Sequence, residues 1–322
     1  MTDALCAVLG CDHPIIQGGL AYVGNGLLAG AVSAAGAFGQ IGSAGRSPDS
    51  LSDEIETAKE RAGGHSFGVN LPISEHRDIE DYAAVIERKA ADLRAVSLSA
   101  GNPRPYITRF QACGLKVIVV VSTAEQAVKA ATAGADVIVA EGYEAGGHNG
   151  PAEITTMVLV PQVVRAVSVP VAAAGGIADG AGVAAAFMLG AQGVQMGTRF
   201  VATTECVAHA RYKEMLMRAG AADTCVMERS LGRVTRVLKT PFVQHIMELE
   251  ETKPGFAALA PYIRGERNRA AAVDGEIEEG WLNCGQGVGL IHEIMSASEL
   301  ISRLMTEART AVREGIGALG AR

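Results

Sequence analysis

One histidine stands in a loop whose composition favours chemistry. His148 lies in the segment Ala140–Gly150, where several glycines and the carboxylates of Glu141 and Glu144 surround the imidazole. Histidine changes charge near neutral pH more readily than other side chains, so it suits proton transfer or the stabilisation of an anion. A lone loop histidine is more often an exposed bystander. The glycines and carboxylates favour a functional His148.

Two glycine-rich turns point to a phosphate site. Gly175-Gly176 and Gly197-Thr198 each follow an apolar run and lead toward a helical stretch. Glycine lets backbone N–H groups approach a phosphate closely, and in (β/α)₈ barrels the loops after strands seven and eight bind phosphate. Tight structural turns are the alternative. No Gly-x-Gly-x-x-Gly follows the first strand with an acidic residue about 20 positions on, so a Rossmann site is not indicated.

Three further features have both a functional and a structural interpretation. Gly18-Gly19 can press its backbone against a flat cofactor or form an ordinary turn, and Asn70 can bond a planar ring or cap a strand. The basic stretch Arg229–Lys239 can meet the phosphates of NADPH or an acidic carrier protein. Its structural alternative is a solvated helix face.

The elements that must position these residues alternate between Val/Ile-rich runs and helical stretches. This rhythm predicts βαβ units around a parallel sheet. The predicted strands are Pro14–Gln17, Phe38–Gly42, Phe67–Leu71, Ala95–Ser99, Lys116–Val121, Asp136–Ala140, Val169–Ala174 and Gly193–Gly197. The helices predicted between them include Gly26–Ala35, Ser50–Ala62, Ile79–Ala91, Ala124–Ala133, Thr155–Val167 and Gly180–Leu189.

Eight strand–helix units predict an α/β fold of the (β/α)₈ TIM-barrel class, with an open doubly wound sheet as the alternative. Polar and glycine residues at the carboxyl ends of the strands favour the barrel, because such barrels do their chemistry there. We therefore expect a barrel over residues 1–204. A smaller, partly helical cap over residues 205–285 follows the last barrel strand. Residues 286–322 contain a C-terminal helix, from about Ser296 to Glu314, that packs back on the barrel.

Composition excludes several classes of protein. The 322 residues carry a formal charge of −7 and no basic run, so nucleic-acid binding is not expected. The sequence shows no basic N-terminal segment with an apolar run behind it and no apolar run of about 18 residues, so we expect a cytoplasmic protein. The cysteines are scattered without a C-x-x-C pair, and no His-Glu-x-x-His is present. Neither a disulfide framework nor a metal site is predicted.

At these residues the chain resembles the nitronate monooxygenase (2-nitropropane dioxygenase) superfamily, which includes FMN-dependent enoyl-acyl-carrier-protein reductases. The resemblance runs from about Pro14 to Phe200 and resumes at Cys284–Leu290; it is most specific in Ala140–Gly150 and in the run from Ala173 to Phe200. It implies an FMN cofactor and gives His148 the place of the active-site histidine. The FMN contacts that it implies are Gly18, Gly19, Asn70, Ser122, Glu141, Gly147, Ala174, Gly175, Gly176, Gln195, Gly197 and Thr198.

The motifs around Gly18 and after Phe187 look more like those of the enoyl reductases than like those of fungal-type nitronate oxidisers. The leading hypothesis is therefore that NADPH or NADH reduces FMN, which then reduces an enoyl thioester. Oxidation of nitronates with O₂ and reduction of quinones are the redox alternatives, and a sugar-phosphate isomerase is the non-redox one. A homodimer, and an acyl carrier protein as partner, complete the expectations.

Overall fold

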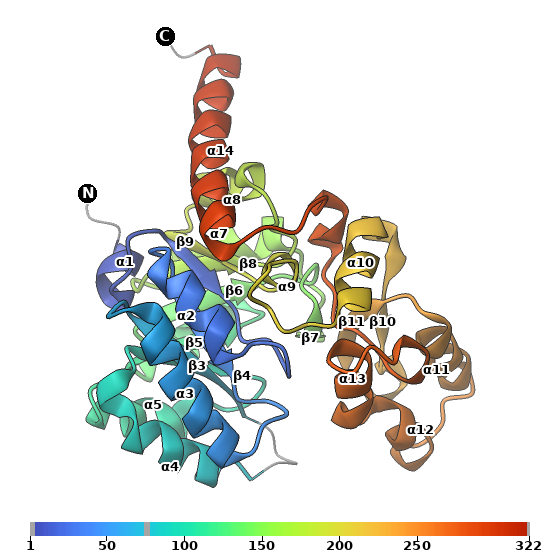
Figure 1. The fold of residues 1–322 in the computed structure, drawn as a ribbon. Helices are drawn as coiled ribbons and strands as arrows, with labels where there is room; N and C mark the ends of the chain where they lie inside the picture. Colours follow the sequence, from blue (N-terminus) through green and yellow to red (C-terminus); the bar gives the residue numbers. More distant parts are fainter. Residues whose placement is uncertain (1–3, 74–77, 321–322) are drawn as a thin grey trace.

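The structure, a computed structural model, describes residues 4–73 and 78–320. At its centre lies a parallel sheet of eight strands with the order β1-β9-β8-β6-β5-β4-β3-β2 (Figure 1). The strands are β1 (Ile15–Gln17), β2 (Gly39–Gly42), β3 (Phe67–Pro72), β4 (Ala95–Ser99), β5 (Lys116–Val121), β6 (Val137–Glu141), β8 (Val171–Ala174) and β9 (Gly193–Met196). Each predicted strand is confirmed, with ends displaced by two residues at most.

Strand β1 closes this sheet. On one side it pairs with β9, Ile15 opposite Val194. On the other side the Gln17 amide donates to the Phe38 carbonyl at 2.9 Å, and the Phe38 amide donates to the Ile15 carbonyl at 2.9 Å, just before β2. A sheet joined at both edges is a barrel. The predicted (β/α)₈ barrel is confirmed, and the open doubly wound alternative is wrong.

One end of the barrel is plugged by a short helix. Leu5 and Leu9 of α1 (Ala4–Leu9) are fully buried in the cluster that also holds Ile16, Phe38 and Ile118 from inside the barrel. The plug lies where the strands begin, because a Cβ built on Gly193, the first residue of β9, would sit 2.9 Å from a Leu5 methyl. The opposite end, where the strands finish, is left for a ligand.

Helices cover the outside of the barrel and bury their apolar faces against the strands. They are α2 (Gly26–Ala34), α3 (Pro48–Ala62), α4 (Glu80–Arg88), α5 (Arg104–Ala112), α6 (Ala124–Thr132), α7 (Thr156–Ala166), α8 (Gly180–Met188) and the short α9 (Thr198–Val201). Side-chain caps fix several starting points; for example, Asp179 accepts a hydrogen bond from the Gly182 amide at the start of α8. No helix within the described residues is long and apolar enough to cross a membrane.

The cap contains both helices and a small sheet. An antiparallel sheet in the order β10-β11-β7 combines β10 (Thr224–Met227) and β11 (Val234–Leu238) with β7 (Gly147–Asn149), which comes from the loop after β6. Its helices are α10 (Ala210–Arg218), α11 (Pro241–Glu251), α12 (Phe256–Ile263) and α13 (Gly265–Ala272) (Figure 1). The helix-face interpretation of Arg229–Lys239 is wrong, because the second half of that stretch forms β11 and every residue of this strand is buried.

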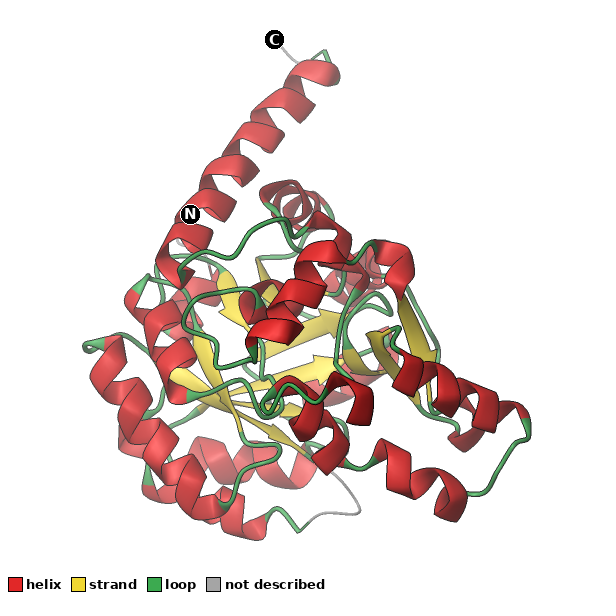
Figure 2. Ribbon diagram, turned by 45° about the vertical axis from the view of Figure 1, so that its right-hand side comes forward, coloured by secondary structure: helices red, strands yellow, loops and turns green. Residues whose placement is uncertain are grey.

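The C-terminal helix α14 (Ala297–Ala318) begins at Ser296, whose side chain and that of Glu299 form a capping box. Its first half packs on α8 and buries Leu300, Ile301 and Leu304, as predicted. The second half is largely exposed and extends beyond the body of the molecule (Figures 1 and 2). The helix thus packs back on the barrel over only part of its length.

Candidate active site

The carboxyl ends of the barrel strands and the facing side of the cap enclose a cavity of about 1460 Å³. Ligand pockets usually measure about 300–1,000 Å³, so this one has room for a cofactor together with a substrate. Every residue predicted for the site lines it: Gly18, Gly19, Asn70, Ser122, Glu141, Gly147, His148, Ala174, Gly175, Gly176, Gln195, Gly197 and Thr198. The fold thus collects these residues from the ends of six barrel strands and the loops that follow them, while their individual roles stay predictions.

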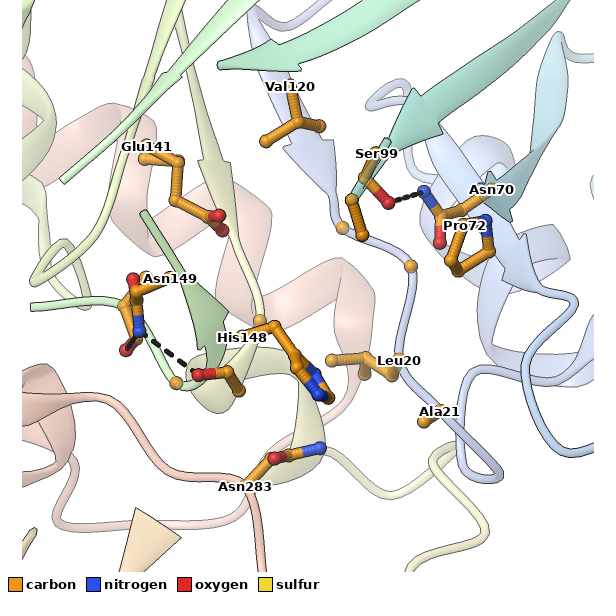
Figure 3. A pocket seen from close by; sticks show the side chains of 18 of the residues that line it. Leu20, Ala21, Asn70, Pro72, Ser99, Val120, Glu141, His148, Asn149 and Asn283 are labelled. Atoms are coloured by element: carbon orange, nitrogen blue, oxygen red, sulfur yellow. Dashed lines mark hydrogen bonds between the residues drawn. The ribbon is translucent and has the colours of Figure 1, made fainter. Parts of the chain in front are cut away.

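On the wall formed by the ends of β1 and β3, the backbone of Gly19 lies very close to the side chain of Asn70, which hydrogen bonds hold in place. A Cβ built on Gly19 would lie 2.3 Å from the Asn70 Cβ. The Asn70 side-chain amide donates to the Ser97 hydroxyl at 2.9 Å and lies 3.4 Å from the Ser99 hydroxyl (Figure 3). Because neighbouring β4 occupies this nitrogen, the amide oxygen of Asn70 is the atom left for a ligand.

The Gly175-Gly176 turn presents backbone N–H groups to the cavity. Both residues have left-handed backbone angles, φ +100° and +73°, which favour glycine. No described residue accepts a hydrogen bond from either amide N–H. The Thr156 hydroxyl donates to the Gly175 carbonyl at 2.9 Å and holds the turn in place. Fixed, free N–H groups of this kind make an anion cradle.

Thr198 adds a hydroxyl beside this cradle. Its oxygen accepts a hydrogen bond from the Gly285 amide at 3.0 Å, so the hydroxyl proton stays available to a ligand. Gln195, on the preceding strand β9, accepts a hydrogen bond from the Gln40 side chain at 3.4 Å. Both side chains are therefore oriented by the protein before any ligand binds.

Glu141 is a carboxyl group in an environment that disfavours its charge. It ends β6, lies deep among protein atoms with one side open to the cavity, and has no hydrogen-bond partner among the described residues (Figure 3). This burial raises the pKa of Glu141 to about 7. A ligand that donates hydroxyl groups to this carboxyl would supply the partners that the protein does not.

Ser122 lines the cavity and is also held by the helix that follows it. Its amide and hydroxyl both donate to the Gln126 side-chain oxygen, at 2.8 and 3.1 Å, near the start of α6. A Cβ on Gly150 would lie 2.1 Å from the Ser122 hydroxyl oxygen, so this glycine allows the His148 loop to pass. Ser122 borders the cavity while helping to fix its wall.

His148 reaches the cavity from β7, the edge strand of the cap sheet. Thr235 of β11 lies opposite it in register. The His148 side chain is 63% exposed and points toward Leu20 on the far side of the opening (Figure 3). Its Nε2 lies 4.0 Å from a carboxylate oxygen of Glu228. The imidazole is thus free to meet a ligand held between the two walls.

Most of the basic stretch is structural rather than ligand-facing. Arg236 is 3% exposed; it donates to the Tyr143 carbonyl at 3.0 Å and stacks on the Tyr143 ring. Arg229 pairs with Glu153, and Lys239 donates to the Ala222 carbonyl. Of the four basic residues only Arg233 lines the cavity. Arg104 and Lys129, both exposed, add positive charge to its lining from the barrel side.

Sequence reasoning missed Glu228, Asn283 and Trp281, which also line the cavity. Asn283 and Trp281 immediately precede the Cys284–Leu290 motif, which is a usable signal for Asn283. For Glu228 the sequence gives no such signal, because only the pairing of β10, β11 and β7 brings it to the histidine.

The residues present fit FMN. The cavity offers an anion cradle with free N–H groups, a close backbone approach at Gly18-Gly19 for a flat ring, and an unpartnered carboxyl for hydroxyl groups. Gly175-Gly176 and Thr198 would hold the phosphate, and Gly19 and Asn70 would border the ring.

Comparison with known proteins agrees with this arrangement. The structure of FabK from Thermotoga maritima superposes with a TM-score of 0.91 at 41% identity, covering 98% of each chain. A nitronate monooxygenase of Pseudomonas aeruginosa is 34% identical over 96% of this chain and 100% of its own length. A (3aS,4S,5R,7aS)-5-hydroxy-7a-methyl-1-oxo-octahydro-1H-indene-4-carboxyl-CoA dehydrogenase of Mycobacterium tuberculosis is 31% identical over 95% of this chain and 96% of its own.

The family model for nitronate monooxygenase matches residues 2–307, which include the barrel, the cap and the first half of α14. The matched segment contains every residue of the cavity described above. The chain belongs to the nitronate monooxygenase family of oxidoreductases.

Proposed function

We propose that this chain is an FMN-dependent reductase in which NADPH or NADH is the reductant and an enoyl thioester is the substrate. One observation carries the proposal: a cavity of about 1460 Å³ places a phosphate-type cradle and a ring-bordering wall opposite an exposed histidine. FMN, when bound, supplies reversible acceptance and release of hydride.

The chain's own residues bind, orient and deliver a proton. Gly175-Gly176 and Thr198 anchor the cofactor, and the carboxyl of Glu141 accepts its hydroxyl groups. His148 stands on the opposite wall and gives a proton to the substrate carbon or thioester oxygen. Cap residues line one side of the space between them.

Two relatives support a thioester substrate. The Mycobacterium tuberculosis relative is named for a carboxyl-CoA substrate, and the chain is 41% identical to FabK. Arg104, Lys129 and Arg233 line the cavity and suit the phosphates of a coenzyme A or phosphopantetheine carrier, or those of the nicotinamide nucleotide. An acyl carrier protein is the macromolecular partner that we propose for such a thioester.

Nitronate oxidation is the second candidate, favoured by the family match and by the Pseudomonas aeruginosa relative. In that reaction His148 would stabilise the anionic substrate instead of donating a proton. Quinone reduction needs no proton donor at a carbon atom, so it makes the least use of His148.

Anaerobic mixing separates these functions. NADPH or NADH is added to the FMN-loaded protein, and the visible absorbance of oxidised flavin is followed before an acceptor is added. Bleaching by a nucleotide and recovery with an enoyl thioester support the proposal. Recovery with a quinone alone favours the quinone reductase. If a nitronate bleaches the flavin and neither nucleotide does, the proposal is rejected in favour of nitronate oxidation. A protein that binds no FMN would reject all three flavin-dependent functions.

A further inference from the structure

Glu228 is a buried carboxylate that the mechanism above does not use. It follows β10, is 3% exposed and lines the cavity on the cap side. Charged side chains are rarely buried to this extent unless something in the fold or the function requires them. Glu228 therefore needs an account of its own.

Its backbone conformation is one that glutamate seldom adopts. Glu228 has φ +71°, in the left-handed region that favours glycine. The surrounding chain holds it there: the Glu228 amide donates to the Glu250 carboxylate at 2.8 Å, and the same carboxylate accepts from the Ser230 amide at 2.9 Å. Strained residues braced in this way gather at functional sites. A glycine would satisfy the backbone here, so the carboxylate is the part that needs explaining.

The side chain of Glu228 is aimed at the histidine. The Thr235 hydroxyl donates to its Oε2 atom, and Thr235 is the residue opposite His148 in the sheet. The same Oε2 lies 4.0 Å from the His148 Nε2, slightly beyond a direct hydrogen bond. Arg233 approaches the other oxygen, Oε1, at 3.8 Å. Catalytic hydrogen bonds are often this long before a ligand binds.

The remaining surroundings of His148 leave Glu228 as its carboxylate neighbour. Asn149, the last residue of β7, and Asn283, close to Gly147, have neutral side chains. Arg236, the next charged residue on β11, is engaged by the Tyr143 carbonyl and the Thr224 hydroxyl. No other ion pair of His148 occurs within residues 4–73 and 78–320.

We propose that Glu228 is the positioning residue of His148: it accepts the Nε2 proton, fixes the ring, and leaves Nδ1 to exchange a proton with the substrate. Thr235 keeps the carboxylate oriented, and the cap sheet keeps all three side chains in register. This inference rests on the proposed role of His148 as a proton donor. A hydrogen bond from Nε2 to the carboxylate selects one of the two neutral tautomers of the ring.

The test compares Glu228→Gln and Glu228→Asp with the wild type, and uses Glu251→Gln, an exposed position on α11, as the matched charge control. Histidine labelled with ¹⁵N in the ring reports the tautomer of His148, whose signals are assigned by their loss in His148→Gln. Flavin content, kcat and KM are measured on the same FMN-loaded samples.

We expect Glu228→Gln to move the His148 ring signals away from the Nε2–H tautomer and to lower kcat about 10- to 100-fold, with KM and flavin content within about twofold. Glu228→Asp should restore part of both, and Glu251→Gln should change neither. Unaltered ring signals in Glu228→Gln overturn the inference, and so does a loss of flavin content that accounts for the whole loss of rate. If the wild type turns over no enoyl thioester, the proposed function is rejected. The ring signals of His148 still test the role of Glu228, because they do not depend on the substrate.

Discussion

His148 is the proposed proton donor of the cavity, and its removal should separate catalysis from cofactor binding. The cradle at Gly175-Gly176 and the wall at Gly19 and Asn70 belong to other loops. We expect His148→Ala to retain FMN and to lose about 10²- to 10⁴-fold in turnover. Turnover and flavin stoichiometry are measured together, with the exposed, remote His65→Ala as control. Unchanged turnover with every acceptor would contradict the assigned role.

Glu141 makes the stability of the FMN-free protein depend on pH. Its pKa is raised to about 7 by burial, so the folded state prefers the protonated form. The stability that this preference contributes is present below the unfolded pKa of 4.5 and is lost as the pH rises through about 7, at most about 3 kcal/mol. The free energy of unfolding should fall between about pH 5 and pH 8, and less steeply in Glu141→Gln.

Urea unfolding of the FMN-free wild type and Glu141→Gln at both pH values measures this difference. For each protein the change in the free energy of unfolding between the two pH values is taken, so the contribution of groups that titrate alike in the two proteins cancels. Identical pH slopes would show that the Glu141 carboxyl finds a partner or solvent in the folded state.

At the scale of elements, the turn after β8 depends on having no side chain. Gly176 has φ +73° and an amide N–H without a partner among the described residues. We expect Gly176→Val to weaken FMN retention because it strains the turn and covers the cradle. Gly114→Val, at φ +82° with open space around it, imposes comparable backbone strain far from the cavity. Flavin content after gel filtration distinguishes them, and equal retention would place the phosphate elsewhere.

Arg236 ties the cap sheet to the loop that leads to His148. Its guanidinium is buried, donates to the Tyr143 carbonyl and the Thr224 hydroxyl, and stacks on the Tyr143 ring. Arg236→Met keeps the aliphatic stem and leaves these acceptors unpaired. The free energy of unfolding should fall by about 2–3 kcal/mol, whereas the exposed Arg218→Met should leave it nearly unchanged. Urea titrations of both variants measure the two free energies of unfolding. Equal losses in the two variants would contradict the stabilising role of Arg236 between the cap sheet and the loop.

The elements also show where sequence patterns suffice. Runs such as Lys116–Val121 are buried on both faces, and glycine or polar residues end them, so local composition predicts each barrel strand closely. In the cap, β11 contains Arg236, and an arginine in a sequence suggests a solvent-exposed position. The structure shows that it is buried because it donates to the Tyr143 carbonyl and the Thr224 hydroxyl. Strands β7 and β10 are too short for a period-two pattern. Strand β10 pairs with the nearby β11, but β11 pairs with β7 across about 85 positions of the sequence, Val234 opposite Asn149. The approach of Glu228 to His148 depends on this long-range pairing and could not be predicted from local patterns.

For the molecule as a whole, the projecting half of α14 contributes little to folding. From Arg313 onward every described residue is exposed. Deleting residues 313–322 should therefore shift the unfolding temperature by no more than about 2 °C, as calorimetry can measure. A larger loss would mean that another surface covers this helix. Light scattering on the same samples tests the homodimer, which stays a prediction.

The placement of His148 has a consequence for how this scaffold can be re-engineered. The proposed flavin cradle belongs to the barrel, but the histidine is held by β7, which pairs with a cap strand. A chimera that receives residues 205–285 from another family member would keep the cofactor-binding barrel and acquire a new partner strand for β7. Donor caps should therefore be chosen by whether their edge strand reproduces the His148–Thr235 register. A donor cap without this register would yield a yellow protein that binds its cofactor but has no catalytic activity.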